Sequence, residues 1–92
     1  MTKVELTRSV YHSLSKLPGY IVSKLRTWIA QIEMLGLREV RKYSGYHDEP
    51  LKGSRSGQRS IRLSHSYRAI YIESANGQVE IVTVIEVNKQ EY

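Results

Sequence analysis

Residues 46–71 read YHDEPLKGSRSGQRSIRLSHSYRAIY, and within them the chain changes from helical to strand-like periodicity. The run QRSIRL alternates, with Ser60 and Arg62 on one face and Arg59 and Ile61 on the other. SHS is typical of a turn, and YRAIYIES is strand-like and rich in aromatic residues. We therefore expect a β-hairpin, and one that carries many cations.

The segments on either side of this hairpin complete an α+β pattern. Asn76-Gly77 is a strong hairpin signal, and the strand that follows it has apolar residues on both faces. Upstream, apolar residues recur at helical spacing on both sides of Pro18-Gly19, which separates two helices. The expected elements are a strand at 3–6, helices at 8–17 and 20–35, a helical turn at 37–42, and strands at 58–63, 67–74 and 78–88.

The order β-α-α-β-β-β predicts a two-layer α+β fold, in which the first strand and the helical hairpin pack on a mainly antiparallel sheet. A length of 92 residues suits one domain, residues 1–92. The alternation leaves open which face of the last strand is buried. We expect much of the core to be formed by Val10, Leu14, Leu25, Trp28, Ile29, Ile32, Ile61, Leu63, Ile70 and Ile81.

Composition excludes several classes of protein. The chain has no cysteine, which rules out disulfides and thiolate chemistry. No apolar run approaches transmembrane length, and residues 1–16 lack the apolar core of a signal peptide. We therefore expect a small cytoplasmic protein.

The net charge of +5 is unevenly distributed along the chain. Residues 1–37 carry +3, residues 38–68 carry +5 and residues 69–92 carry −3. A basic middle third of this kind is typical of proteins that bind nucleic acid or another polyanion. It is also compatible with a solvated face whose charge keeps the protein soluble.

The sequence shows no motif for binding a metal or a phosphate-bearing cofactor. His12, His47 and His65 lack the paired spacing of metal ligands. The run GSRSG precedes a strand, whereas a phosphate-binding loop of the common type precedes a helix. We expect no metal and no cofactor.

The acidic run that opens the hairpin region has two interpretations. His47, Asp48 and Glu49 supply titratable groups beside the cations, so one of them could act as a general base while the cations hold a phosphate. The alternative is an exposed acidic turn before Pro50.

Arg68 lies inside the apolar run YRAIY, in the middle of an expected strand. Arginine is rarely fully buried without a partner. Arg68 therefore either faces the outer surface of the sheet or contacts an acid such as Glu80 or Glu86. Its flat head with several donors suits a phosphate.

The segments HDEPLKGSRSGQRSIRLSHSYRAIY and EIVTVIEVNKQEY resemble the RelE/HigB/YoeB superfamily of type II toxin–antitoxin toxins. The resemblance implies a compact RelE-like fold and a metal-independent endoribonuclease, an mRNA interferase that cleaves mRNA in the ribosomal A site. It also implies three partners: the ribosome, mRNA, and a cognate antitoxin that is acidic and partly disordered. The toxin–antitoxin complex would bind its own operator DNA through the antitoxin.

The resemblance also assigns roles to particular residues. Glu49 matches a glutamate proposed as general base, and Arg68 matches the arginine that holds the scissile phosphate. Tyr92 matches a tyrosine that stacks on a base or donates a proton, and Arg62 completes the catalytic set. The residues expected to bind RNA are His47, Lys52, Arg55, Arg59, Lys89 and Gln90.

One departure from the family pattern bears on activity. Relatives often read NKHDY where this chain reads NKQEY, and Gln90 cannot titrate. The acid role would then fall to Tyr92, Lys89 or His47. Two alternatives to an active endoribonuclease follow: a catalytically weakened relative, and a ParE-like inhibitor of DNA gyrase that is not an enzyme.

Overall fold

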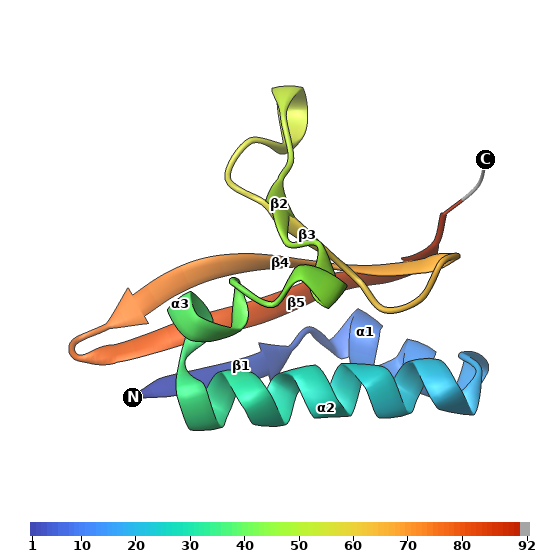
Figure 1. The fold of residues 1–92 in the computed structure, drawn as a ribbon, viewed down its shortest axis with the longest axis horizontal. Helices are drawn as coiled ribbons and strands as arrows, with labels where there is room; N and C mark the ends of the chain where they lie inside the picture. The colour runs from blue at the N-terminus through green and yellow to red at the C-terminus, as the bar shows by residue number, and fades with distance from the viewer. Residues whose placement is uncertain (91–92) are drawn as a thin grey trace.

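The computed structural model describes residues 1–90 as a five-stranded mixed sheet with helices packed against it (Figure 1). The α+β class and the mainly antiparallel sheet are confirmed. In chain order the elements, with η marking a 3₁₀ helix, are β1 (Thr2–Leu6), α1 (Arg8–Ser13), η1 (Leu14–Lys16), α2 (Gly19–Leu35), α3 (Leu37–Val40), η2 (Ser44–Tyr46), β2 (Glu49–Pro50), η3 (Gly53–Arg55), β3 (Arg59–Arg62), β4 (Tyr67–Asn76) and β5 (Val79–Lys89).

The first helix is shorter than its apolar spacing predicts. Thr7 caps the N-terminus of α1, and its hydroxyl accepts a hydrogen bond from the Val10 amide (3.2 Å). It ends at Ser13, whose hydroxyl donates to the Val10 carbonyl (2.7 Å), and η1 follows. Serine hydroxyls compete with helical backbone bonds in this way. Leu17 is already extended, because the proline that follows it disfavours helical geometry.

The second helix is confirmed, and it starts one residue earlier than predicted. Its buried stripe consists of Ile21, Leu25, Trp28 and Ile32. Gly36, at φ +87°, ends α2, since this conformation is strained for residues with a side chain.

Strand order in the sheet is β1-β5-β4-β3-β2, with β1 parallel to β5 and every other pair antiparallel. The two-residue strand β2 was not predicted, because it is too short to show a period and contains a proline. In Figure 1, the segment with β2 and η3 projects at the end of the sheet farthest from α2. No helix in the described part of the chain is both long and apolar enough to cross a membrane.

A bulge in β5 explains why that strand is apolar on both faces. Tyr71 pairs with Val84, whereas the neighbouring Ile70 pairs with Glu86, so Ile85 is an extra residue between them. Val82 and Val84 are buried before the bulge. Ile81 alternates with the buried Val82 and therefore points to the opposite face. It is only half-buried, so the prediction of Ile81 as a core residue is wrong.

The core lies between α2 and the sheet. Trp28 is fully buried and its ring centroid lies 5.4 Å from that of Tyr71 on β4. Seven of the predicted core residues are buried, namely Val10, Leu25, Trp28, Ile32, Ile61, Leu63 and Ile70. Leu14 and Ile29 are only partly buried, at the margin of the core.

Candidate functional site

The candidate site lies on the sheet face that points away from α2. Ile61, Ala69 and Tyr71 belong to the core cluster that includes the buried stripe of α2. Since successive side chains of a strand point to opposite faces, Arg62 and Arg68 point away from that core. We call this side of β2, β3, β4 and β5 the open face.

Register brings side chains of four strands together on the open face. Arg62 on β3 is directly opposite Arg68 on β4, which in turn is opposite Asn88 on β5. In the neighbouring row, Glu49, Ser60, Ile70 and Glu86 follow one another across β2, β3, β4 and β5. The β5 bulge places Glu86 and Asn88 on this face.

Arg68 is half-buried and has a defined partner. Its Nε donates a hydrogen bond to Asn88 Oδ1 (3.3 Å). Of the two alternatives for Arg68, the outer surface of the sheet is the one observed, and none of the contacts found within residues 1–90 joins Arg68 directly to Glu80 or Glu86. Glu80 lies at the far end of β5, where it accepts a hydrogen bond from the Thr2 hydroxyl (3.2 Å).

Arg55 reaches the same face from the projecting segment. Its guanidinium forms an ion pair with Glu86, and its Nε donates to Gln58 Oε1 (2.7 Å). Glu86 also accepts a hydrogen bond from Asn88 Nδ2 (3.3 Å). Arg55 and Arg68 thus belong to one connected set of contacts.

Arg62 is exposed, and none of the hydrogen bonds or ion pairs found within residues 1–90 involves its side chain. Like charges directly opposite each other on neighbouring strands repel. The juxtaposition of Arg62 with Arg68 therefore costs stability in the free protein, and a bound anion would relieve it.

Glu49, on the edge strand β2, and His47, just before β2, are both exposed. His47 Nε2 lies 3.6 Å from Glu49 Oε2. His47 adopts φ +50°, a left-handed conformation that is uncommon for residues other than glycine. The exposed acidic turn is thus present, and pairing of β2 with β3 fixes the Glu49 backbone next to Ser60.

Asp48 was not predicted to be buried or to hold other side chains in place. Its side chain is 1% exposed. It accepts hydrogen bonds from Arg59 Nε (2.7 Å) and from the Tyr71 hydroxyl (2.5 Å), and Arg41 Nε lies 3.9 Å away. The pKa of the Tyr71 hydroxyl is raised, mainly by burial and to a lesser degree by the hydrogen bond to Asp48.

Arg59 therefore has a structural partner. It was predicted to contact RNA, but it lies on the core side of β3 and is paired with Asp48. The alternation of QRSIRL places Arg59 with Ile61, and this was the available signal that Arg59 and Arg62 differ.

The remaining predicted residues lie in different places. Lys52 is exposed at the start of the projecting segment. Lys89 is exposed at the end of β5, opposite Tyr67, so it lies on the face opposite to that of Arg68 and Asn88. The backbone amide of Gln90 donates a hydrogen bond to the backbone carbonyl of Ser66 (2.5 Å). Tyr92 lies outside the described residues.

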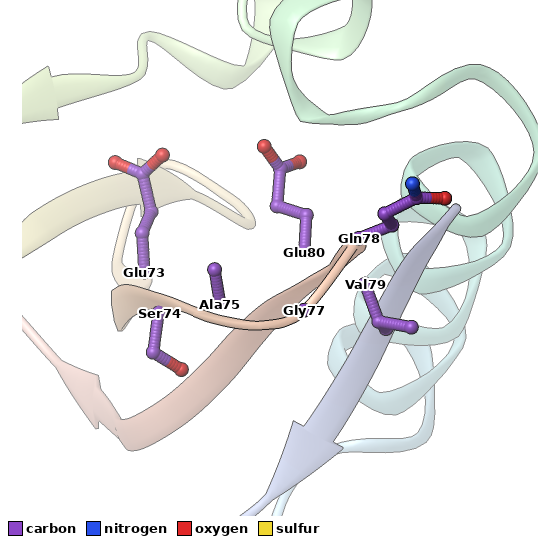
Figure 2. Close-up of a pocket in the computed structure, with 7 residues that line it drawn as sticks. All are labelled: Glu73, Ser74, Ala75, Gly77, Gln78, Val79 and Glu80. Carbon is purple, nitrogen blue, oxygen red and sulfur yellow. The ribbon is translucent and has the colours of Figure 1, made fainter.

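A groove of about 420 Å³ lies at the other end of the β4–β5 ribbon (Figure 2). Figure 2 shows the carboxylates of Glu73 and Glu80 on the same side of this hairpin end. No lysine or arginine lines the groove. Glu73 is paired with Arg41 (3.0 Å), which does not itself line the groove. With carboxylates as its only charged lining residues, the groove is unsuited to a phosphate, and it is separate from the arginines of the open face. Residues 1–90 contain no group of three or more histidine or carboxylate side chains that could hold a metal ion.

No family model matches the sequence, and no curated protein matches it either. Solved structures do match over nearly the whole chain. A YoeB/ParE toxin from Agrobacterium tumefaciens superposes with a TM-score of 0.72 at 22% identity, covering 98% of this chain and 99% of that chain. YafQ from E. coli superposes with a TM-score of 0.73 at 15% identity, covering 98% and 94%.

A third match was solved with a partner. YoeB in the YoeB–YefM complex from Staphylococcus aureus superposes with a TM-score of 0.69 at 17% identity, covering 100% of this chain and 99% of that chain. The matched structures include toxins in toxin–antitoxin complexes. The expected RelE-like fold is thus confirmed, and the chain shares the fold of these solved toxin structures.

Proposed function

We propose that this chain, a single RelE-like domain over residues 1–92, is the toxin of a type II toxin–antitoxin system and cleaves mRNA on the ribosome. The observation that carries the proposal is the juxtaposition of Arg62 and Arg68 on the open face, with Glu49 exposed two strands away. The exposed Arg62 and the half-buried Arg68 lie on one face and can together bind a phosphate, and a carboxylate on the same face can take a proton.

The reaction follows from these groups. Glu49 removes the proton of a ribose 2′-OH, and the 2′ oxygen attacks the adjacent phosphorus. The P–O5′ bond breaks, which leaves a 2′,3′-cyclic phosphate and a 5′-OH. Arg68 and Arg62 stabilise the negative charge that accumulates on the phosphoryl oxygens.

The departing 5′ oxygen takes up a proton. Lys89 was expected as a donor, but it directly follows Asn88 on β5 and therefore points to the face opposite to that of Arg68. Tyr92 has the role of acid or base-stacking residue by resemblance, and His47 is a further donor beside Glu49. Gln90 cannot act as an acid, so an enzyme with lower activity than its relatives fits the same site.

Ribosome dependence follows from how little the site supplies on its own. Glu49 and His47 are exposed, and the best-formed pockets within residues 1–90 are lined by other residues. Positioning of the reactants accounts for a large share of most enzymatic rate enhancements. The ribosome would provide that positioning by presenting mRNA in the A site, in the cytoplasm.

The partner proposed for regulation is a cognate antitoxin. Matched toxins of the same fold are found in complexes with antitoxins. An acidic, partly disordered antitoxin would cover the arginines of the open face as it folds. The complex would bind its operator DNA through the antitoxin.

Induction in cells separates the proposal from gyrase inhibition. We expect new mRNA 5′-OH ends within coding regions after induction of the wild-type chain. Replacing Glu49 with Gln should remove them, since the amide cannot take the proton. DNA breaks and an SOS response without RNA ends would instead favour the gyrase inhibitor. The absence of both would favour the weakened relative.

A further inference from the structure

Glu86 has no role in the reaction proposed above, yet it connects two of the arginines. It forms an ion pair with Arg55 and accepts a hydrogen bond from Asn88 (3.3 Å). Asn88 in turn accepts a hydrogen bond from Arg68 (3.3 Å). The contacts run from the projecting segment, through β5, to the centre of β4.

The sequence builds this connection through the sheet register. Asn88 is directly opposite Arg68, and Glu86 is directly opposite Ile70. Glu86 and Asn88 are two residues apart on one strand, so they share a face. The fully buried Ile70 beside Arg68 leaves Asn88 as the polar neighbour of Arg68 on β5.

We propose that Glu86 is a positioning residue, which orients Arg55 directly and Arg68 through Asn88 toward the same phosphate. The inference rests on the proposed function, because it assigns the direction of two arginines relative to RNA. Both guanidinium groups lie at the end of long side chains with several rotatable bonds. Fixing them before RNA binds removes part of the cost of ordering them in the transition state.

The sign of the effect distinguishes positioning from simple charge. Glu86 adds a negative charge beside the arginines, so removing it makes the open face more positive. Coulomb attraction alone then predicts tighter RNA binding and faster cleavage. Positioning predicts slower cleavage even though RNA binding is not weakened, because the arginines no longer meet the reacting phosphate in the right orientation.

Two variants separate the two contacts of Glu86. Glu86→Ala removes both, so Arg55 and Arg68 should both become mobile. Glu86→Gln keeps an acceptor for Asn88 but loses the ion pair, so only Arg55 should become mobile. Glu80→Gln is the matched control, since Glu80 is a carboxylate on the same strand whose contact is with Thr2 at the other end.

The experiment has a spectroscopic part that does not depend on activity. The Nη–Hη signals of Arg55, which forms the ion pair with Glu86 through Nη2, and the Nε–Hε signal of Arg68 report whether each guanidinium is held, through their exchange with water in the protein without RNA. We expect fast exchange at both arginines in Glu86→Ala, at Arg55 alone in Glu86→Gln, and at neither in Glu80→Gln. Unchanged exchange at Arg68 in Glu86→Ala would overturn the proposed connection.

The functional part compares kcat for ribosome-bound mRNA with the affinity for an RNA that carries a 2′-deoxy residue at the cleavage position. Glu86→Ala should lower kcat about ten- to a hundredfold, with affinity unchanged or tighter and with the melting temperature measured on the same samples. Faster cleavage by Glu86→Ala would show that Glu86 opposes the arginines, and would overturn the inference. If the wild type does not cleave at all, the proposed function fails, and the exchange data still decide whether Glu86 orients the arginines.

Discussion

Arg59 and Arg62 lie three residues apart on β3 and have opposite surroundings. Arg59 is 22% exposed and bound to the buried Asp48, whereas Arg62 is exposed on the open face. A cation that is already paired with a carboxylate contributes little to the binding of a polyanion. The cations of residues 46–71 thus have two different roles. Some, such as Arg59, stabilise the fold, and others, such as Arg62, are available to bind an anion.

Asp48→Ala should destabilise the fold strongly. It would leave Arg59 and the Tyr71 hydroxyl without their buried acceptor, and breaking such a pair costs about 3–5 kcal/mol. Chemical denaturation gives the free energy of unfolding. Glu39→Ala is the control, since Glu39 forms an exposed pair with Lys42 whose loss costs at most about 1 kcal/mol. Equal effects of the two substitutions would contradict the buried role of Asp48.

Tyr71 should make stability fall at alkaline pH. Burial and the hydrogen bond to Asp48 raise its pKa in the folded state. The folded protein therefore holds this proton more tightly than the unfolded chain, and the stability it contributes is full below the ordinary tyrosine pKa of about 10 and is lost as pH rises above it. Thermal unfolding measured against pH should show this decline, and Tyr71→Phe should flatten it. An identical slope in Tyr71→Phe would exclude Tyr71 as its source.

At the level of elements, α2 holds the sheet through a few large side chains. Trp28 is fully buried against Tyr71 on β4. Trp28→Ala should cost about 3–5 kcal/mol of unfolding free energy, because it removes a large buried ring and leaves a cavity. Met34→Ala, on the exposed side of the same helix, should cost much less. A small effect of Trp28→Ala in denaturant titrations would contradict the assigned core.

The sequence predicted elements well where a period extends over many residues. Helical spacing in α2 identified Leu25, Trp28 and Ile32 as buried, and the alternation along β3 identified Ile61, because each pattern spans several turns or several residues of one face. Ile29, at the margin of the stripe, is only partly buried. Prediction failed where one residue changes the geometry. The β5 bulge at Ile85 reverses the faces of the strand, and β2 has two residues, so neither produces a pattern.

The site was predictable in part for the same reason. Alternation placed Arg62 on the face opposite Arg59 and Ile61, and the structure agrees; its position opposite Arg68 comes from the register, which the sequence did not predict. The contact between Arg68 and Asn88 could not be read from the sequence, because it depends on the bulge. Asp48 was missed because its burial arises from three separate segments that meet around it.

At the level of the whole molecule, the two ends of the β4–β5 ribbon differ in charge. The groove of Figure 2 carries Glu73 and Glu80, whereas the open face near the other end carries arginines. This separation gives RNA one favourable end of the sheet. It also agrees with the uneven distribution of charge along the sequence.

RNA affinity should depend steeply on salt, since phosphate contacts release counterions. Replacing Lys52 and Arg62 with Gln should reduce the slope of log K against log salt by about 1.4, as expected for two contacts to a single strand. The control pair Lys16→Gln and Arg38→Gln removes the same charge from exposed positions on the helices. Equal slopes for the two double variants would mean that net charge alone, and not the open face, binds RNA.

Cleavage of ribosome-bound mRNA by the wild-type chain and by Arg68→Ala, with melting temperatures from the same preparations, tests the central claim most directly. The wild type should leave 5′-OH ends. Arg68→Ala should cleave about 10²–10³ times more slowly, the usual cost of removing one preorganised donor to a developing negative charge, at a nearly unchanged melting temperature. Arg68→Lys should recover little, because a point charge does not reproduce the planar guanidinium. A destabilised Arg68→Ala protein that cleaves at the wild-type rate per folded molecule would contradict the account.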